Sequence, residues 1–213
     1  MELDYSEKSI NHAMIDFTKK AKNDGRRGPF YNGKQDWVFE KNNERLFYNA
    51  VWQAYLDANR TMRGIKGTDK ERGAFINLAR KIQMFFLDNE APLSHEDWCR
   101  GFIDDLKKYN DFDARYGHAQ KVVNMAFKYL YCCKNADKNR FEECHMPLDQ
   151  YTLAWFFMES GKLYQEWSWL DPDKYYGIED EIKNILHNDI LGKELVIWNE
   201  FKYRIINLKE QHR

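Results

Sequence analysis

The sequence predicts an all-α protein, a compact bundle-like array of about eight helices in a single domain spanning residues 1–213. Apolar residues recur at helical spacing in one segment after another, and no run alternates like a strand for long. The chain also contains only 4 Pro and 11 Gly, too few for the many turns of a sandwich or barrel. The alternative to a single domain is a subdivision near residues 110–116.

The predicted helices are separated by recognisable breaks. They cover residues 5–22, 42–59, a stretch that begins at 68, 94–109, 117–133 and 147–160, with two more helices in 178–209. Thr68 and Glu71 form a capping box that opens the third helix. Glycine and proline indicate the remaining breaks: DPDKYYG, residues 171–177, is predicted to be a turn, and Gly192 to separate the last two helices.

Composition and terminal sequence exclude several classes of protein. The net charge of -1 provides no overall field that would drive the chain onto nucleic acid or an anionic membrane, so any DNA contact must be local. The acidic first residues lack the basic segment and apolar run of a signal peptide, and the longest apolar run, 153–158, cannot span a bilayer. Four cysteines without a CxxC pair indicate a reducing compartment. We therefore expect a cytoplasmic protein that does not enter the membrane.

Motifs for common cofactors and metals are missing from the sequence. No glycine-rich phosphate loop of the Walker or Rossmann type occurs, and neither GxSxG nor HExxH is present. Cys144 and His145 are adjacent, but no second pair stands at the spacing of a zinc site. The sequence therefore predicts no cofactor and no metal.

Two residues at consecutive helix starts suit covalent catalysis. Lys121 falls in the first or second turn of a helix opened by Gly117, where the partial positive charge of the helix start disfavours a second positive charge. A lysine must lose its proton before it can attack carbon, so this position suits a nucleophile. Asp149 follows Pro147 at the start of the next helix, where the same partial charge keeps a carboxylate ionised.

The segments QKVVNMAFKYL and HMPLD, within residues 117–153, resemble the lysine helix and the aspartate segment of helix-hairpin-helix (HhH-GPD) DNA glycosylases, closest to the archaeal 8-oxoguanine glycosylase branch. The resemblance implies that Lys121 attacks the sugar carbon that bears the damaged base, forming a Schiff base, while Asp149 assists. It also implies double-stranded DNA as the partner and a DNA-glycosylase-like fold. This chain has FDARYGHAQK where common family members carry a glycine-rich LPGVG-type hairpin, and its spacing from lysine to aspartate is longer.

A glycosylase also needs a pocket for the flipped base and cations for the DNA backbone. Candidates for the base pocket are Gln120, His118 and Trp198, with Trp155 and Phe201 as further apolar faces. Candidates for phosphate contacts lie in two loops rich in basic residues and glycine, namely Arg26, Arg27, Arg60, Arg63 and Lys66. Solvated loops would explain the same composition.

A second hypothesis needs no catalytic pair. Lysines at exposed helix starts are common, and an acidic residue in a first turn stabilises a helix by roughly 0.3–1 kcal/mol without any catalysis. The chain could then be a non-catalytic helical module that binds a protein or a nucleic acid. The two hypotheses differ in geometry, because only the enzyme needs Lys121 and Asp149 to face one cleft.

Overall fold

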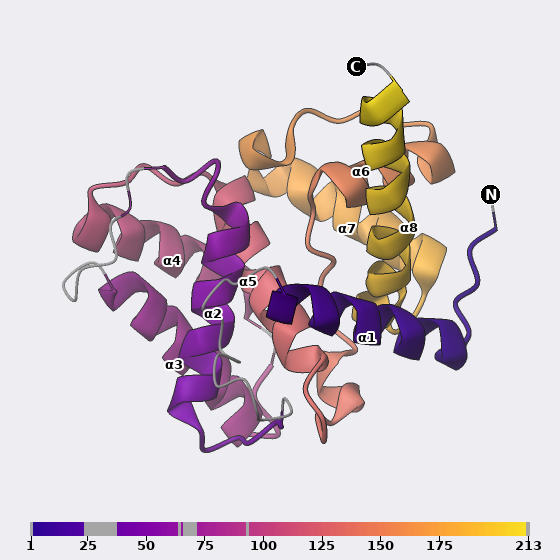
Figure 1. Cartoon of the computed structure of the whole chain (residues 1–213). Coiled ribbons are helices and arrows are strands. Elements are labelled where there is room, and N and C mark those ends of the chain that lie inside the picture. Colours follow the sequence, from indigo (N-terminus) through magenta and orange to yellow (C-terminus); the bar gives the residue numbers. More distant parts are fainter. Residues whose placement is uncertain (1, 24–37, 64, 66–71, 93, 212–213) are drawn as a thin grey trace.

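The structure is a computed structural model that describes residues 2–23, 38–63, 65, 72–92 and 94–211, with side chains up to Arg204. It confirms the all-α prediction, because the described residues form eight α-helices arranged as a bundle (Figure 1). The α-helices are α1 Glu7–Asn23, α2 Glu44–Ala58, α3 Gly73–Leu87, α4 His95–Asn110, α5 Tyr116–Tyr131, α6 Gln150–Ser160, α7 Pro172–Leu186 and α8 Ile190–Gln211. Two short 3-10 helices, η1 Lys138–Phe141 and η2 Trp167–Trp169, lie in the connections.

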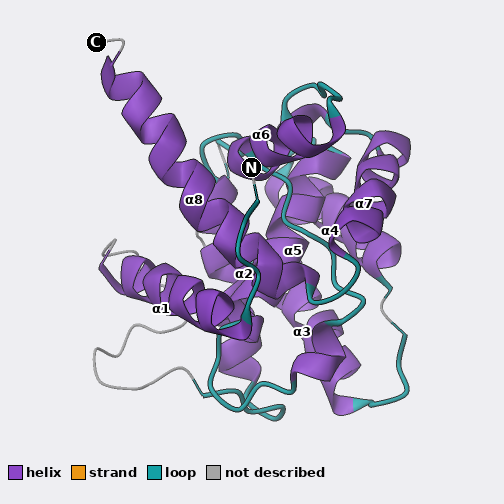
Figure 2. Cartoon of the chain, turned by 90° about the vertical axis from the view of Figure 1, so that its right-hand side faces the viewer, coloured by secondary structure: helices purple, strands orange, loops and turns teal. Residues whose placement is uncertain are grey.

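Helix α5 is the centre of the bundle. All 16 of its residues are buried, because α2, α4, α7 and η2 all pack on it. Helix α3 packs on α2 and α4, whereas α1 and α6 pack on α8. Figure 1 shows α2, α3 and α4 to the left of α5 and α6, α7 and α8 to its right, and Figure 2 shows α1 and α8 on one side of the molecule. One hydrophobic cluster contains residues from all eight helices.

Aromatic rings fill much of this cluster. The ring centroid of Phe86 in α3 lies 5.0 Å from that of Phe39, 5.1 Å from that of Phe141 in η1 and 5.9 Å from that of Phe127 in α5. Trp98 of α4 stacks on Phe127 of α5 with centroids 5.5 Å apart. Rings at these separations attract one another beyond their burial of apolar area, so they hold α3, α4 and η1 against the central helix.

Helix starts account for the largest differences from the sequence predictions. The segment predicted as a turn begins α7 instead, because Asp171 accepts a hydrogen bond from the amide of Lys174 at 2.9 Å and Pro172 occupies the first turn. The last two helices separate at residues 187–189, where His187 has φ 65° and Asp189 has φ 46°. Gly192 therefore lies inside α8. The capping box of Thr68 and Glu71 falls outside the described residues.

Within the described part of the chain, no helix is both long enough and apolar enough to cross a membrane.

Candidate active site

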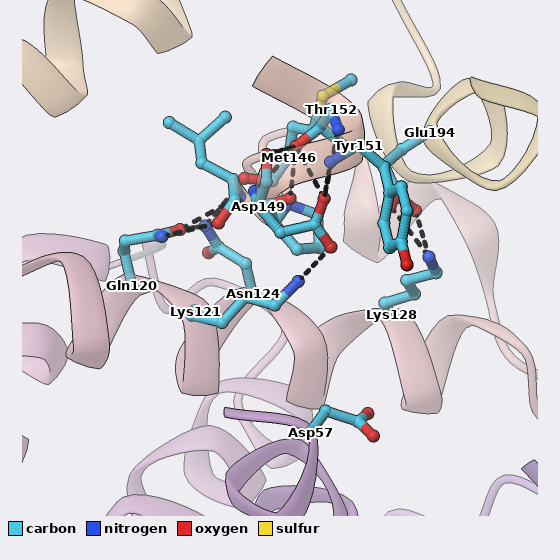
Figure 3. A network of polar contacts seen from close by, with 12 residues as sticks. Asp57, Gln120, Lys121, Asn124, Lys128, Met146, Asp149, Tyr151, Thr152 and Glu194 are labelled. Atoms are coloured by element: carbon cyan, nitrogen blue, oxygen red, sulfur yellow. Dashed lines mark hydrogen bonds and ion pairs between the residues drawn. The ribbon is translucent and has the colours of Figure 1, made fainter. Parts of the chain in front are cut away.

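Lys121 and Asp149 form a buried ion pair between α5 and the start of α6. The Nζ atom of Lys121, in the second turn of α5, lies 2.8 Å from Oδ2 of Asp149. The two residues are only 5% and 9% exposed. Figure 3 shows both side chains pointing toward one another across the gap between the two helices. The two predicted catalytic residues are therefore in direct contact, although they stand 28 positions apart.

Asp149 is also the N-cap of α6, which starts at Gln150 rather than at Pro147. Its Oδ1 atom accepts the amides of Tyr151 at 2.8 Å and Thr152 at 3.1 Å. Burial alone would raise the pKa of Asp149, but the charge and hydrogen bond of Lys121, with the Thr152 amide, outweigh burial and leave this pKa below its ordinary value. Asp149 is therefore a fixed carboxylate whose second oxygen faces the lysine.

The ion pair forms part of the wall of a cavity of about 300 Å³ between α1, α2, α5, α6, α8 and η2. Charged and polar residues of this wall include Lys20, Gln53, Asp57 and Arg60, and its aromatic residues are Phe17, Tyr129, Tyr151, Trp167 and Trp198. This volume is at the lower end of the range of small-molecule sites. The mixture of flat apolar faces with a few charged groups suits a ligand that is both aromatic and polar.

A second buried ion pair lies one heptad along the same helix. Nζ of Lys128 is 2.6 Å from Oε2 of Glu194 in α8, and both side chains are 0% exposed. The ammonium group also lies 4.5 Å from the ring centroid of Phe17 and 4.9 Å from that of Trp198, both in the cavity wall. Burial raises the pKa of Glu194, although Lys128 acts in the opposite direction.

The sequence predictions missed Lys128 and Glu194. Residues seven apart on a helix lie on one face, so Lys128 could have been recognised from its spacing to Lys121. The signal was weak because Lys128 stands among apolar residues, where a lysine with its head group in solvent is the usual arrangement. Nothing near Glu194 in the sequence indicates that it meets α5.

The residues predicted for the base pocket occupy different places. Trp198 lines the cavity, with its ring against Phe17 in an edge-to-face contact at 5.5 Å. Gln120 is fully buried outside the cavity lining and binds the backbone of Leu148. His118 also lies outside the lining, and its Nδ1 accepts the amide of Arg115 as part of the start of α5. Burial, with the charge of Arg115, lowers the pKa of His118 to about 4.

The two remaining apolar candidates, Trp155 and Phe201, are buried in the hydrophobic cluster outside the cavity lining.

The predicted phosphate-binding residues are only partly described. Arg60 lines the cavity and is exposed, whereas Arg63 is exposed outside the lining. Arg26, Arg27 and Lys66 fall outside the described residues. Lys20 of α1, which the sequence analysis did not select, also lines the cavity, and its Nζ is 4.9 Å from the centroid of the Trp198 ring. The described cations at the cavity are therefore Lys20 and Arg60, besides Lys121.

The connection from α4 to α5 stands where the resemblance would put a DNA-gripping hairpin. Five amides in or next to this connection bond within the chain: Asp111 to Lys107, Phe112 to Leu106, Ala114 to Phe112, Arg115 to His118 and Gly117 to Leu170. The side chains of Asp111 and Asp113 are 93% and 88% exposed and both pair with Lys107. Because these amides are already bonded and its carboxylates are exposed, the α4–α5 connection is a poor phosphate site.

Cys144 and His145 contribute to the core. Cys144 is buried, and burial raises the pKa of its thiol. The His145 ring stacks on His95 with centroids 4.3 Å apart. Within the described residues, no group of three or more His, Cys, Asp and Glu side chains is arranged to hold a metal ion.

Comparisons of the chain with protein families, with curated proteins and with solved structures gave no match. The site therefore has to be interpreted from its own geometry.

Proposed function

We propose that this protein is a DNA glycosylase with AP-lyase activity that excises an oxidised purine such as 8-oxoguanine. The observation that carries the proposal is the contact between Lys121 and Asp149 in the wall of an aromatic cavity. A nucleophilic lysine, a carboxylate beside it and a pocket for an extruded base are the parts that this reaction needs. The local resemblance of residues 117–153 to helix-hairpin-helix glycosylases supports the same activity.

The proposed reaction uses Lys121 as the nucleophile. After its ammonium group has released a proton to solvent, the Nζ lone pair forms a bond to C1′ of the deoxyribose, and the electrons of the C1′–N9 bond leave with the base, which takes up a proton from solvent. The C1′–O4′ bond then breaks as a proton passes from Nζ to O4′, which opens the sugar ring and leaves a protonated Schiff base between Nζ and C1′. Asp149, whose pKa is lowered, remains an anion and stabilises positive charge that develops at C1′ and Nζ.

The cavity supplies the faces that a flipped purine requires. Phe17 and Trp198 form one side of it, and Trp167 and Tyr151 line it as well. The ammonium of Lys128 lies within 5 Å of the first two ring centroids. An oxidised purine presents both donors and acceptors at its edge, so the polar side chains of the cavity wall, which include Gln53 and Asp57, favour it over an apolar ligand.

DNA contacts are proposed at Arg60 and Lys20 rather than at the α4–α5 hairpin. Both cations line the cavity, and phosphates of the strand that enters the cavity would pass close to them. The bonded amides and the exposed carboxylates of the α4–α5 connection disfavour phosphate binding there.

Borohydride trapping tests the proposal directly. The protein is incubated with a duplex that carries one 8-oxoguanine, sodium borohydride is added, and the covalent adduct is measured on a denaturing gel. We expect an adduct with the wild type and with Lys107→Ala, an exposed-lysine control, and none with Lys121→Gln. Asp149→Asn retains an oxygen for the α6 cap and should slow adduct formation by about 10²-fold or more.

Two outcomes would overturn the proposal. One is a folded wild type that gives no adduct and releases no base, and the other is an adduct that persists in Lys121→Gln. Absence of chemistry together with retained binding to the duplex would instead support a non-catalytic nucleic-acid-binding module. Circular dichroism of each variant establishes that it is folded.

A further inference from the structure

The segment from Met146 to Asp149, which leads into α6, is buried but has no regular secondary structure. Its backbone therefore needs partners other than a helix or a sheet. Gln120 provides two of them: its Nε2 donates to the carbonyl of Leu148 at 3.1 Å, and its Oε1 accepts the Leu148 amide at 3.2 Å. Figure 3 shows the side chain of Gln120 reaching this segment beside Lys121.

Other side chains hold the remaining backbone groups of the segment. Asn124 donates from Nδ2 to the carbonyl of Met146 at 3.0 Å, and Glu179 of α7 accepts the Met146 amide at 3.1 Å. Thr152 donates to the carbonyl of Pro147 at 3.1 Å and accepts the amide of Asp149 at 2.8 Å. Each backbone donor and acceptor from the Met146 amide to the Asp149 amide is thus bonded to a side chain.

This arrangement ties the aspartate to the helix that bears the lysine. Gln120 is the neighbour of Lys121 in α5, and Leu148 is the neighbour of Asp149. The two hydrogen bonds between Gln120 and Leu148 therefore fix the start of α6 relative to the helical turn from which Lys121 projects. The side-chain amide of Gln120 supplies both the acceptor that the Leu148 amide needs and the donor that the Leu148 carbonyl needs.

We propose that Gln120 and Asn124 are positioning residues that set the separation between the Lys121 amine and the Asp149 carboxylate. The inference rests on the proposed function, because it assigns these two residues to the same reaction. Neither of them lines the cavity, so they act through Asp149 and do not touch the substrate. A misplacement of about 1 Å at a reacting group can cost about 10²-fold in rate.

The kinetics of Gln120→Met and Asn124→Leu test whether the two residues affect the rate of base release. Gln83→Met is the matched control, because Gln83 is a buried glutamine outside the cavity lining whose Nε2 binds one backbone carbonyl, that of Lys41. Under single-turnover conditions we expect Gln120→Met and Asn124→Leu to lower the rate of base release by about 10- to 100-fold. The half-saturating concentration of duplex should stay within about twofold, and Gln83→Met should retain the wild-type rate.

The pH profile separates positioning from a general loss of stability. If Gln120 holds Asp149 beside Lys121, Gln120→Met should move the acid limb of the rate profile to higher pH, because a less well-paired carboxylate protonates more readily. Destabilisation without displacement of Asp149 would leave this limb unchanged. Full rate and an unchanged acid limb in folded Gln120→Met would overturn the inference.

A thermodynamic cycle keeps the inference testable without any activity. Unfolding equilibria are measured for the wild type, Gln120→Met, Asp149→Asn and the double variant. Asp149→Asn should lower the folding equilibrium constant both in the wild type and in Gln120→Met. We expect the factor by which it does so to be roughly 3- to 10-fold smaller in Gln120→Met. Additive effects of the two substitutions would overturn the positioning role. A wild type that gives no adduct would overturn the proposed function, and the cycle would then still test whether Gln120 positions Asp149.

Discussion

Helix α5 carries two lysines, Lys121 and Lys128, that each meet a carboxylate in the interior. The first pair borders the cavity, and the second has no exposed surface. A charge without a partner in the interior costs several kcal/mol, so each pair is stable only while both members are present. A ligand in the cavity can reach only the first pair, whereas the second, which solvent does not reach, joins α5 to α8.

Removal of one member of the second pair is predicted to be strongly destabilising. Lys128→Met leaves the Glu194 carboxylate buried without its cation, and we expect a loss of about 3–5 kcal/mol in the free energy of unfolding, measured in urea. The double variant Lys128→Met with Glu194→Leu should recover most of this loss. Lys162→Met, which breaks the largely exposed pair with Glu181, serves as the control and should leave the free energy of unfolding nearly unchanged. A double variant no more stable than Lys128→Met would contradict this account.

The helices around α5 were well predicted from periodicity, because an apolar stripe on such a helix packs against α5 or against another helix. Their starts were predicted less well, since the same residue types open a helix and form a turn. Asp171 and Pro172 are an example: they were interpreted as a turn, but they are the N-cap and first residue of α7.

Lys121 and Asp149 could be selected as candidates from the sequence because both lie near helix starts. The hydrogen bonds between Gln120 and Leu148 could not be predicted. They join positions 28 apart through side-chain to backbone contacts, which leave no periodic pattern in the sequence. The contact between Lys121 and Asp149 depends on the packing of α5 against the segment before α6.

The start of α5 depends on a glycine. A Cβ atom at Gly117 would collide with the carbonyl oxygen of Trp167 in η2, whereas a Cβ at Gly177 in α7 would meet no neighbouring atom. We expect Gly117→Ala to cost about 1–3 kcal/mol and to displace Trp167, which lines the cavity. Gly177→Ala should instead add up to about 1 kcal/mol, because alanine favours a helix interior. Urea unfolding and tryptophan fluorescence measure both effects, and a neutral Gly117→Ala would contradict the close packing.

The molecule as a whole contains a second buried polar cluster on the side of α5 that faces α4 and α7. His95 binds Asn124 through Nε2 at 2.8 Å and stacks on His145, which binds Tyr175 at 2.9 Å. Burial lowers the pKa of His95 to about 4, although its bond to Asn124 acts the other way. Burial in the same region raises the pKa of Glu179 to about 8. The free energy of unfolding should therefore contain two pH-dependent contributions of opposite sign, one from His95 and one from Glu179.

The histidine effect belongs to mildly acidic solution. An unfolded histidine binds a proton near pH 6.5, whereas native His95 stays neutral until about pH 4. Its contribution is fully present above pH 6.5 and is lost as the pH falls toward 4, because protons then favour the unfolded chain. We expect the free energy of unfolding to fall less steeply in His95→Gln than in the wild type over this range. His12→Gln, at an exposed histidine of α1, serves as the comparison variant.

The glutamate effect has the opposite sign and belongs to neutral and basic solution. Native Glu179 keeps its proton up to about pH 8, while an unfolded glutamate loses it near pH 4.3. The native state thus binds the proton more tightly, so this contribution is present below about pH 4.3 and is lost as the pH rises through 8. Glu179→Gln keeps an oxygen for the Met146 amide and cannot ionise.

The free energy of unfolding of Glu179→Gln should therefore exceed that of the wild type at pH 8.5, and the excess should shrink as the pH is lowered to 5. Because Glu179 also holds the segment that leads to Asp149, ionisation of its carboxylate weakens the core and the candidate site together. Urea unfolding at a series of pH values measures the difference, with Glu90→Gln, at an exposed residue, as the control. Parallel pH profiles for Glu179→Gln and the wild type would show that Glu179 is already ionised in the native protein, and the buried neutral carboxyl would have to be abandoned.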